Sequence, residues 1–350
     1  NDDGRYTPDS FNRLTTAITD AENFVRDMAV TRKTYSEVAA AVRALKDAVS
    51  GLQLDTSAAR EELDAAIASA EAIEGKPLLG DAAAFAAAFK QAKDVAAQAN
   101  ATSETLTAAT AALVAAMRGV TVKVADFAAD FSDGQGNSGW AFYRIAPTNW
   151  DDYNAGGARV ELKYSDGAYK DGETTVGVEL WKTSGATVAY RNYSAAKHTY
   201  ALRGQIEYIG DGEEACVAYV ILRADGRYEH IANWNTYRVG AAHTIDKEFT
   251  LQAGDAVLLV LRDVGGAATD SKLTLQIGCN DALTVDKSRL QALADEAGEK
   301  NADDYTAESF AELTAAKTVA QSVLDKAEPT AGEVYRAESA LRRAIERLET

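Results

Sequence analysis

Aromatic side chains in polar surroundings are the residues of this sequence best suited to chemistry with a ligand. All four tryptophans lie between residues 120 and 280. Sugars expose C–H faces that stack on flat rings, and their hydroxyl groups need nearby Asp, Asn or Arg side chains. Residues 149–154 and 233–238 have this composition. With one residue of a predicted strand, they supply five candidate carbohydrate-binding residues: Trp150, Tyr153, Trp181, Trp234 and Tyr237.

Trp181 lies in a run that we predict as a single strand, Thr175–Lys182. The apolar residues alternate along it, with Val176, Val178 and Leu180 on one face. Trp181 falls on the opposite face, so it is either exposed or covered by a neighbouring loop or helical module. For all five aromatic candidates, packing in a core or an interface is the alternative to sugar stacking.

Metal and disulfide chemistry have one candidate each. Asp130, Asp133 and Asn137 have a loop spacing suited to a structural calcium, without the EF-hand pattern, and turn formation is the alternative. Cys216 and Cys279 lack the spacing of metal ligands. They are a candidate disulfide, and two buried thiols are the alternative. We expect no other cofactor.

No catalytic motif is recognisable in the sequence. Residues 134–139 fit the GxGxxG pattern, but a strand-like run follows where a dinucleotide site needs a helix. The three histidines form no pair at ligand spacing, and there is no GxSxG run. Acidic pairs such as Asp151-Asp152 have the chemistry of glycoside hydrolysis, but one sequence does not pair carboxylates across a cleft. We therefore expect a binding protein and not an enzyme.

The charge and hydropathy of the chain exclude two classes of partner. Its 350 residues carry a net charge of −17, whereas nucleic-acid phosphates require clustered Lys and Arg. There is no run of about 18 apolar residues, which a membrane-spanning helix needs. We therefore expect neither a nucleic-acid partner nor membrane insertion.

Residues 120–280 have the pattern of an antiparallel β-sandwich. Short runs rich in Val, Tyr, Thr and Ile are separated by Gly, Asp and Asn, without a helical period. This pattern favours a jelly-roll-like sandwich. The predicted strands are Ala158–Tyr164, Thr175–Lys182, Thr187–Tyr193, Gln205–Ile209, Ala215–Leu222, Phe249–Leu251, Ala256–Arg262 and Lys272–Ile277.

A helical signature is repeated at the two ends of the chain. Residues 6–14, YTPDSFNRL, match residues 305–313, YTAESFAEL, at the Tyr, Thr, Ser, Phe and Leu positions. Apolar residues then follow at i, i+3, i+4 and i+7. Residues 55–119 and 281–350 each predict three helices that bury their stripes in a small bundle. Residues 1–54 carry only the second and third, so we expect the first helix of that module before Asn1, in a longer protein.

These helical stretches resemble FIVAR modules, which are found in various architectures. The resemblance rests on the Tyr-Thr-x-x-Ser-Phe-x-x-Leu signature, an Ala-rich stripe and a last helix that ends Ala-Leu-x-x-Ala-Ile or similar. It implies a secreted or cell-surface bacterial protein in which the modules act as spacers. The expected order is a partial FIVAR-like module at 1–54, complete ones at 55–119 and 281–350, and the sandwich at 120–280.

The middle segment resembles the β-sandwich accessory domains of bacterial polysaccharide-degrading enzymes. The matching runs are Phe131-Ser132, residues 134–136, Gly139–Tyr143, Leu251–Val257 and Asp270. The resemblance implies a carbohydrate-binding module without catalytic activity.

We therefore expect a non-catalytic accessory region of a large carbohydrate-active protein. The sandwich would bind a polysaccharide or host glycan by aromatic stacking, and the catalytic domain would lie elsewhere in the same parent protein. Two alternatives stay open: a purely structural stalk of an extracellular enzyme or adhesin, and a protein-binding adhesin region that uses a helical face. Exposure of Trp150 and Trp234 would favour glycan binding, and an apolar patch on a helical module would favour the adhesin.

Overall fold

The computed structural model describes residues 6–53, 55–145, 159–172, 174–182, 185–209, 215–236, 240, 242–262 and 270–350. The chain divides into two compact units. One consists of Asn1–Lys76 with Gly80–Val120, and the other of Pro77–Leu79 with Thr121–Thr350. None of the helices in the described residues is long and apolar enough to cross a membrane.

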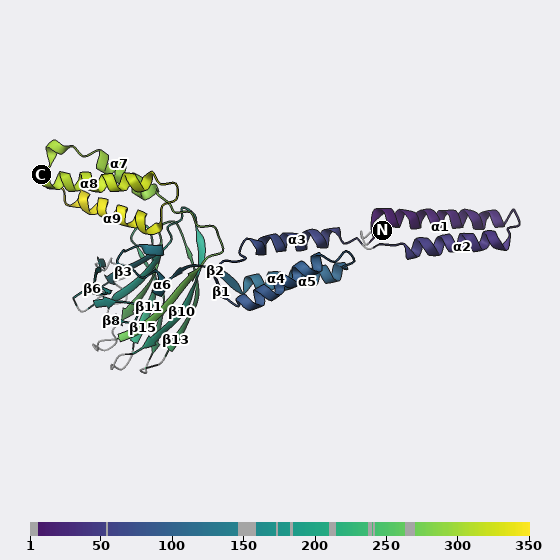
Figure 1. The fold of residues 1–350 in the computed structure, drawn as a ribbon, viewed down its shortest axis with the longest axis horizontal. Helices are drawn as coiled ribbons and strands as arrows, with labels where there is room; N and C mark the ends of the chain where they lie inside the picture. Colours follow the sequence, from purple (N-terminus) through teal and green to yellow (C-terminus); the bar gives the residue numbers. More distant parts are fainter. Residues whose placement is uncertain are drawn as a thin grey trace. The chain divides into compact units, whose positions relative to one another are not determined.

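The first unit is helical in its described residues (Figure 1). Thr34 begins the second helix with a capping box, in which its side chain and that of Glu37 each accept a hydrogen bond from the other's backbone N–H. Leu63, Leu106 and Leu113 are fully buried where the last three helices pack together. The helices are α1 (Pro8–Met28), α2 (Tyr35–Ser50), α3 (Ser57–Glu71), α4 (Ala82–Ala96) and α5 (Ser103–Arg118).

The second unit ends in the three-helix bundle that the sequence predicts. Its helices are α7 (Ser288–Gly298), α8 (Ala307–Leu324) and α9 (Ala331–Glu346). Thr330 and Glu333 form a capping box at α9, as Thr34 and Glu37 do at α2. Each helix contributes a fully buried leucine to one apolar cluster: Leu290, Leu313 and Leu341.

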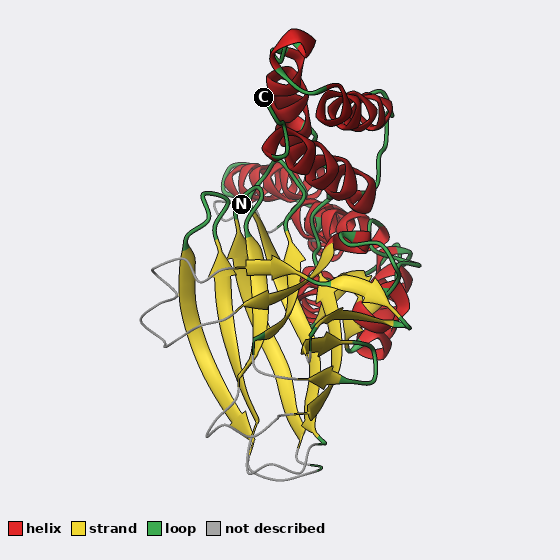
Figure 2. Cartoon of the chain, turned by 90° about the vertical axis from the view of Figure 1, so that its left-hand side faces the viewer, coloured by secondary structure: helices red, strands yellow, loops and turns green. Residues whose placement is uncertain are grey.

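The rest of the second unit is an antiparallel β-sandwich, as predicted (Figure 2). In the described residues, one sheet has nine strands, with the path β1-β2-β15-β8-β7-β6-β5 and with β10 between β15 and β13. The other has six, in the order β12-β11-β14-β9-β3-β4. The strands are β1 (Leu78–Gly80), β2 (Val120–Asp126), β3 (Trp140–Ile145), β4 (Arg159–Glu161), β5 (Lys163–Ser165), β6 (Ala168–Asp171), β7 (Thr174–Val176), β8 (Trp181–Lys182), β9 (Ala186–Arg191), β10 (His198–Tyr208), β11 (Ala215–Leu222), β12 (Tyr228–Thr236), β13 (Ala242–Leu251), β14 (Ala256–Arg262) and β15 (Asp270–Gly278).

The six-stranded sheet is apolar on both faces. Successive residues of a strand point to opposite faces, so Phe142 and Val188 enter the core between the sheets. Their neighbours Ala141 and Ala189 belong to a second apolar cluster on the outer face, which also contains Tyr335 of α9. The small side chains of this face allow the helix to approach the sheet closely.

Tyr335 attaches α9 to the sandwich. Its ring lies against Gly136, whose φ of 82° is in the left-handed region and where a Cβ would come within 2.4 Å of the Tyr335 Cβ. The Tyr335 hydroxyl is 3.1 Å from that of Tyr143 and donates a 3.3 Å hydrogen bond to Glu161. The last helix therefore packs on the outer face of the sheet, as Figure 1 shows in yellow beside the strands.

Candidate functional site

Most of the aromatic candidates lie outside the described residues. Trp150, Tyr153 and Tyr237 are among these, and so is the side chain of Trp234. The backbone of Trp234 belongs to β12 and pairs with Val217 of β11, in a strand that the sequence did not predict. A polar composition hid the strand, since Asn residues flank Trp234 on both sides. Sugar stacking by these four residues stays a prediction.

Trp181 is a core residue, and the prediction that it contacts sugar is wrong. Its segment is a hairpin and not one strand, because β7 and β8 pair with each other and the Gly177 N–H donates to the Leu180 carbonyl over 2.8 Å. Val176 and Trp181 are direct partners in this pair, and such partners share a face. Both are fully buried between the sheets. The turn reverses the alternation that had placed Trp181 outside.

The calcium candidates are engaged in local hydrogen bonds. Asp130 Oδ2 accepts from the Asp126 N–H over 2.7 Å and from Trp140 Nε1 over 3.3 Å. Asn137 Nδ2 donates to the Asp130 carbonyl over 2.6 Å. These bonds join α6 (Phe127–Asp130) to the loop before β3. For Asp130 and Asn137 these are the turn interactions that we gave as the alternative, and the calcium site of Asp130, Asp133 and Asn137 stays a prediction.

The disulfide candidate is wrong, because Cys216 and Cys279 are two buried thiols. Cys216 lies at the start of β11 and pairs with Arg262, whereas Leu222 at the other end of β11 pairs with Ala256. Cys279 follows β15 at that second end. About six residues of extended strand, on the order of 20 Å, therefore separate Cys216 from Cys279 along the strand direction. Burial raises the pKa of the Cys279 thiol, which keeps it protonated and unreactive.

His198 is buried and fully hydrogen-bonded. Its Nδ1 lies 2.7 Å from Asp281 Oδ2, and its Nε2 lies 2.8 Å from Ser194 Oγ. With Cys279, the His198 and Asp281 side chains place three ligand atoms within 4.8 Å of one another. Because both ring nitrogens of His198 already have partners, the cluster's evident role is to tie the segment that leads to α7 onto the sandwich.

A cavity of about 330 Å³ lies between the outer face of the six-stranded sheet and the C-terminal helices. Six arginines line it, in a chain whose net charge is −17. The sandwich supplies half of them, α7 supplies one and α9 supplies two. We call this the arginine pocket, after Arg159, Arg191, Arg223, Arg289, Arg342 and Arg343.

Three of these arginines are paired with carboxylates. Arg191 lies 3.7 Å from Glu338, a glutamate of α9 that is only 5% exposed. Arg223 lies 2.8 Å from Asp255 and also pairs with Glu229. Arg343 lies 3.9 Å from Glu161. These pairs fix the walls of the pocket.

The other three arginines have no carboxylate within 4.0 Å in the part of the chain that the structure describes: Arg159, Arg289 and Arg342. Arg159 places its guanidinium 5.1 Å from the centre of the Tyr143 ring. Arg289 lies close to Arg191, since a terminal nitrogen of each is within 4 Å of the place where a Cβ on Gly254 would be. Desolvation of the guanidinium, and then the charge of Arg191, lower the pKa of Arg289, although the residue as a whole is exposed. Arg289 therefore lies beside a second guanidinium group, that of Arg191, and the charge of Glu338 offsets part of the lowering.

Tyr143, Tyr335 and Glu161 form a hydrogen-bonded group in the lining of the pocket. Burial raises the pKa of Tyr335 well above its usual range, so the hydroxyl stays protonated at any physiological pH. Tyr143 and Glu161 are its hydrogen-bond partners, as described above. The pocket therefore offers forked N–H donors, neutral hydroxyls and carboxylate acceptors within one concave surface. This set can bind sugar hydroxyls and acidic groups.

Sequence reasoning missed the arginine pocket because its residues are spread from position 159 to position 343. One signal was available near the C-terminus, where Arg336, Arg342, Arg343 and Arg347 stand close together in an otherwise acidic chain. The matching helix at residues 35–50 has only Arg43 and Lys46 as cations. An arginine-rich outward face in one copy of the repeated helix, and not in the other, indicates a function beyond packing of the module.

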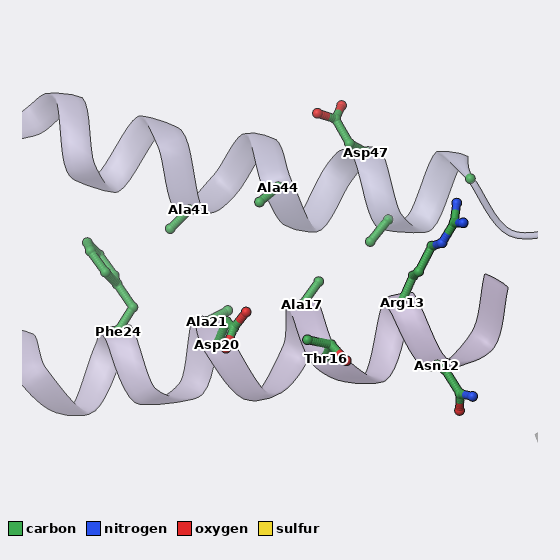
Figure 3. A pocket seen from close by; sticks show the side chains of 12 residues that line it. Asn12, Arg13, Thr16, Ala17, Asp20, Ala21, Phe24, Ala41, Ala44 and Asp47 are labelled. Carbon is green, nitrogen blue, oxygen red and sulfur yellow. The ribbon is translucent and has the colours of Figure 1, made fainter. Parts of the chain in front are cut away.

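A second cavity, of about 690 Å³, lies along the helix pair α1 and α2. Figure 3 shows Ala17 and Phe24 of α1 pointing toward Ala41 and Ala44 of α2 across the space between the helices. The lining is mostly small and apolar. In the C-terminal bundle, α7 packs on both α8 and α9. The groove therefore has the character of a helix-packing surface.

Among curated proteins, a short stretch of this chain is similar to a glycan-cleaving enzyme. Lacto-N-biosidase from Bifidobacterium longum subsp. longum is 48% identical over 69 residues, which are 20% of this chain and 4% of that protein. The chain thus spans a very small part of the relative's length.

Three solved structures show a weak likeness. The CBM51-2 and INT domains of Clostridium perfringens ZmpB, in complex with GlcNAc, are 13% identical over 60% of this chain and 40% of that chain, with a TM-score of 0.18. The xylan-binding CBM22-1 domain of Paenibacillus barcinonensis Xyn10C is 11% identical over 46% and 97%, with a TM-score of 0.28. The N-terminal cellulose-binding domain of Cellulomonas fimi β-1,4-glucanase C is 13% identical over 43% and 95%, with a TM-score of 0.25.

The family comparison concerns the C-terminal bundle. The FIVAR domain family matches residues 286–349, which contain α7, α8 and α9. The Tyr-Thr-x-x-Ser-Phe-x-x-Leu signature at residues 305–313 falls within the matched residues, at the start of α8, and is the sequence feature that predicts the match. Residues 286–349 are therefore a FIVAR domain.

Proposed function

We propose that this chain is a non-catalytic, glycan-binding accessory region of a larger secreted or cell-surface bacterial protein that acts on carbohydrate. The observation that carries the proposal is the arginine pocket, a concave surface on a β-sandwich that is rich in hydrogen-bonding side chains. The FIVAR domain beside it, and the short match to a lacto-N-biosidase, support a carbohydrate-active parent protein.

In this proposal the glycan lies on the outer face of the six-stranded sheet. The forked guanidinium groups donate hydrogen bonds to sugar oxygens, and Glu161 accepts them from sugar hydroxyls. The aromatic candidates from the sequence, Trp150, Tyr153, Trp234 and Tyr237, stay proposed stacking residues whose contribution the screen below tests separately from that of the pocket. The helical modules act as spacers that set the reach of the binding site.

The test is a glycan screen of the full chain by array and by affinity electrophoresis. Ala224 lines the pocket and is exposed, so Ala224→Leu narrows the site without disturbing a core. We expect it to weaken binding, and Arg203→Gln, on the other sheet, to leave binding unchanged. Binding that Trp150→Ala or Trp234→Ala abolishes while Ala224→Leu does not would move the site to the aromatic residues. Retention on no glycan at all would overturn the proposal.

A structural stalk is the second candidate, and the packing of Tyr335 on Gly136 favours it. This contact joins the FIVAR domain to the sandwich, as a stiff spacer requires. A folded chain that binds no glycan and keeps this junction protected from hydrogen exchange would be the stalk.

A further inference from the structure

Six arginines and three glutamates, Glu161, Glu338 and Glu346, line the arginine pocket, so it has an excess of positive charge that neutral sugars do not require. Three of its six guanidinium groups have no carboxylate within 4.0 Å in the described residues, as shown above. Neutral sugars can be held by any good donors and acceptors, whereas unpaired arginines close together repel one another. A bound anion would remove this repulsion, and the planar fork of arginine matches the oxygens of carboxylate and sulfate.

The unpaired arginines come from two different parts of the fold. Arg159 belongs to β4 of the sandwich, Arg289 to α7 and Arg342 to α9. The pocket therefore exists only where the FIVAR domain packs on the sheet. At the position of Arg342, the equivalent helix α2 has Lys46, and at the position of Arg343 it has Asp47. Lys46 keeps the positive charge but not the guanidinium fork, and Asp47 reverses the charge, so the packing of the module does not itself require these two arginines.

We propose that the arginine pocket binds an acidic substituent of a glycan, a sulfate ester or a carboxylate, and that the FIVAR domain supplies part of this site. The proposal rests on the glycan-binding function above and adds to it the class of sugar. Arg289 and Arg342 bind the acidic oxygens, while the paired arginines hold the pocket in shape. The FIVAR domain is then a part of the binding site and not only a spacer.

The experiment is a calorimetric titration of the full chain at low ionic strength. The probes are N-acetylglucosamine 6-sulfate, N-acetylglucosamine, glucuronate, glucose and sodium sulfate. We expect each acidic sugar to bind about tenfold more tightly than its neutral counterpart, because charged hydrogen bonds are the stronger ones. Added salt should reduce this preference, since it screens charges near the surface.

Variants locate the preference within the molecule. The double variant Arg289→Gln with Arg342→Gln should abolish it, while circular dichroism and melting temperature stay unchanged. Arg342→Lys keeps the charge and loses the fork, so it should retain part of the preference. Arg203→Gln is the matched control, because its guanidinium pairs with Asp246 on the nine-stranded sheet.

The outcomes separate this proposal from the one on which it rests. Equal binding of acidic and neutral sugars, unchanged in the double variant, would overturn the acidic substituent and leave glycan binding in place. Free sulfate that binds as tightly as the sulfated sugar would overturn a glycan as the source of the anion. Absence of binding by every sugar would overturn both proposals.

Discussion

The helix pair α1–α2 and the FIVAR domain α7–α9 share a sequence signature but bury it to different extents. Leu313 of α8 and Leu341 of α9 are fully buried, whereas their counterparts Leu14 and Leu45 are only half-buried. In the FIVAR domain, α7 packs across the other two helices. Among the described residues, α1 and α2 pack chiefly on each other and leave the groove of Figure 3 between them. The same stripe is thus a core in one place and a surface in the other.

The outward faces of the two copies differ in the same sense. Tyr335 of α9 is buried on the sandwich, and its counterpart Ala39 in α2 is exposed. The difference shows that two separate sets of residues on these helices have separate roles. The apolar stripe forms the module, and the outward residues decide what the module contacts.

The largest expected effect comes from truncating the shared stripe. Leu341→Ala should lower the free energy of opening of α9 by about 3 kcal/mol, because it leaves a cavity in a closed core. Leu45→Ala should lower that of α2 by about 1 kcal/mol, because the site is half-open. Hydrogen exchange with mass spectrometry measures both. Equal losses in the two helices would show that burial does not distinguish the copies.

The next effect tests the outer face of α9. Gly136→Ala places a methyl group against Tyr335 at a positive φ, so we expect a loss of about 2 kcal/mol at the junction. Faster hydrogen exchange in residues 331–340 would report it. Gly167→Ala is the control for backbone strain, since Gly167 has a φ of 77° with no atom within 4 Å of its Cβ position. The contact with Tyr335 is unimportant if both variants behave alike.

A smaller effect, equal in both copies, is expected at the helix caps. Thr34→Ala and Thr330→Ala each remove a 3.2 Å bond from a backbone N–H to the threonine hydroxyl. Each should cost about 1 kcal/mol, because the bond is local to its own helix. Helix opening measured by hydrogen exchange should shift by the same amount in α2 and α9. A loss confined to α9 would mean that the cap acts through tertiary packing.

The smallest effect is a difference between the two cap glutamates on titration. The Lys326 side chain and the Thr330 backbone lower the pKa of Glu333 to about 2, while the Thr34 backbone and side chain lower that of Glu37. A folded-state pKa below the usual 4.5 means that the stabilisation is complete above pH 4.5 and is lost as the pH falls toward 2. Carboxyl NMR titration should show a pKa below 4.5 for both glutamates, and Lys326→Ala should raise the pKa of Glu333. Two pKa values near 4.5 would contradict it.

Much of the secondary structure follows from local patterns. The predicted strands Ala215–Leu222 and Ala256–Arg262 have the same bounds as β11 and β14. Their uninterrupted apolar residues suit strands that are buried on both faces. The Thr175–Lys182 run failed because Gly177 begins a turn inside it, which alternation alone does not detect. Trp181 shows the consequence, since one unnoticed turn moved a candidate ligand-binding ring into the core.

The candidate site could not be predicted in the same way. Arg159, Arg289 and Arg342 have no common spacing or motif, and their positions become meaningful only when β4, α7 and α9 meet. Cys216 and Cys279 present the converse case, because two cysteines invite pairing until strand order places them at opposite ends of the sandwich. In both cases the deciding quantity is a distance in space between residues that are far apart in the chain.

The sequence by itself determined the classes of structure in this protein. Thr34 and Thr330 begin helices, apolar stripes continue them, and Gly-rich turns separate strands, because these interactions span only a few residues. Tertiary structure alone decided which faces are covered, which thiols are apart and which arginines share a pocket. The physical reason is that burial and electrostatic energy depend on neighbours brought together by folding, and those neighbours are not recorded in local spacing.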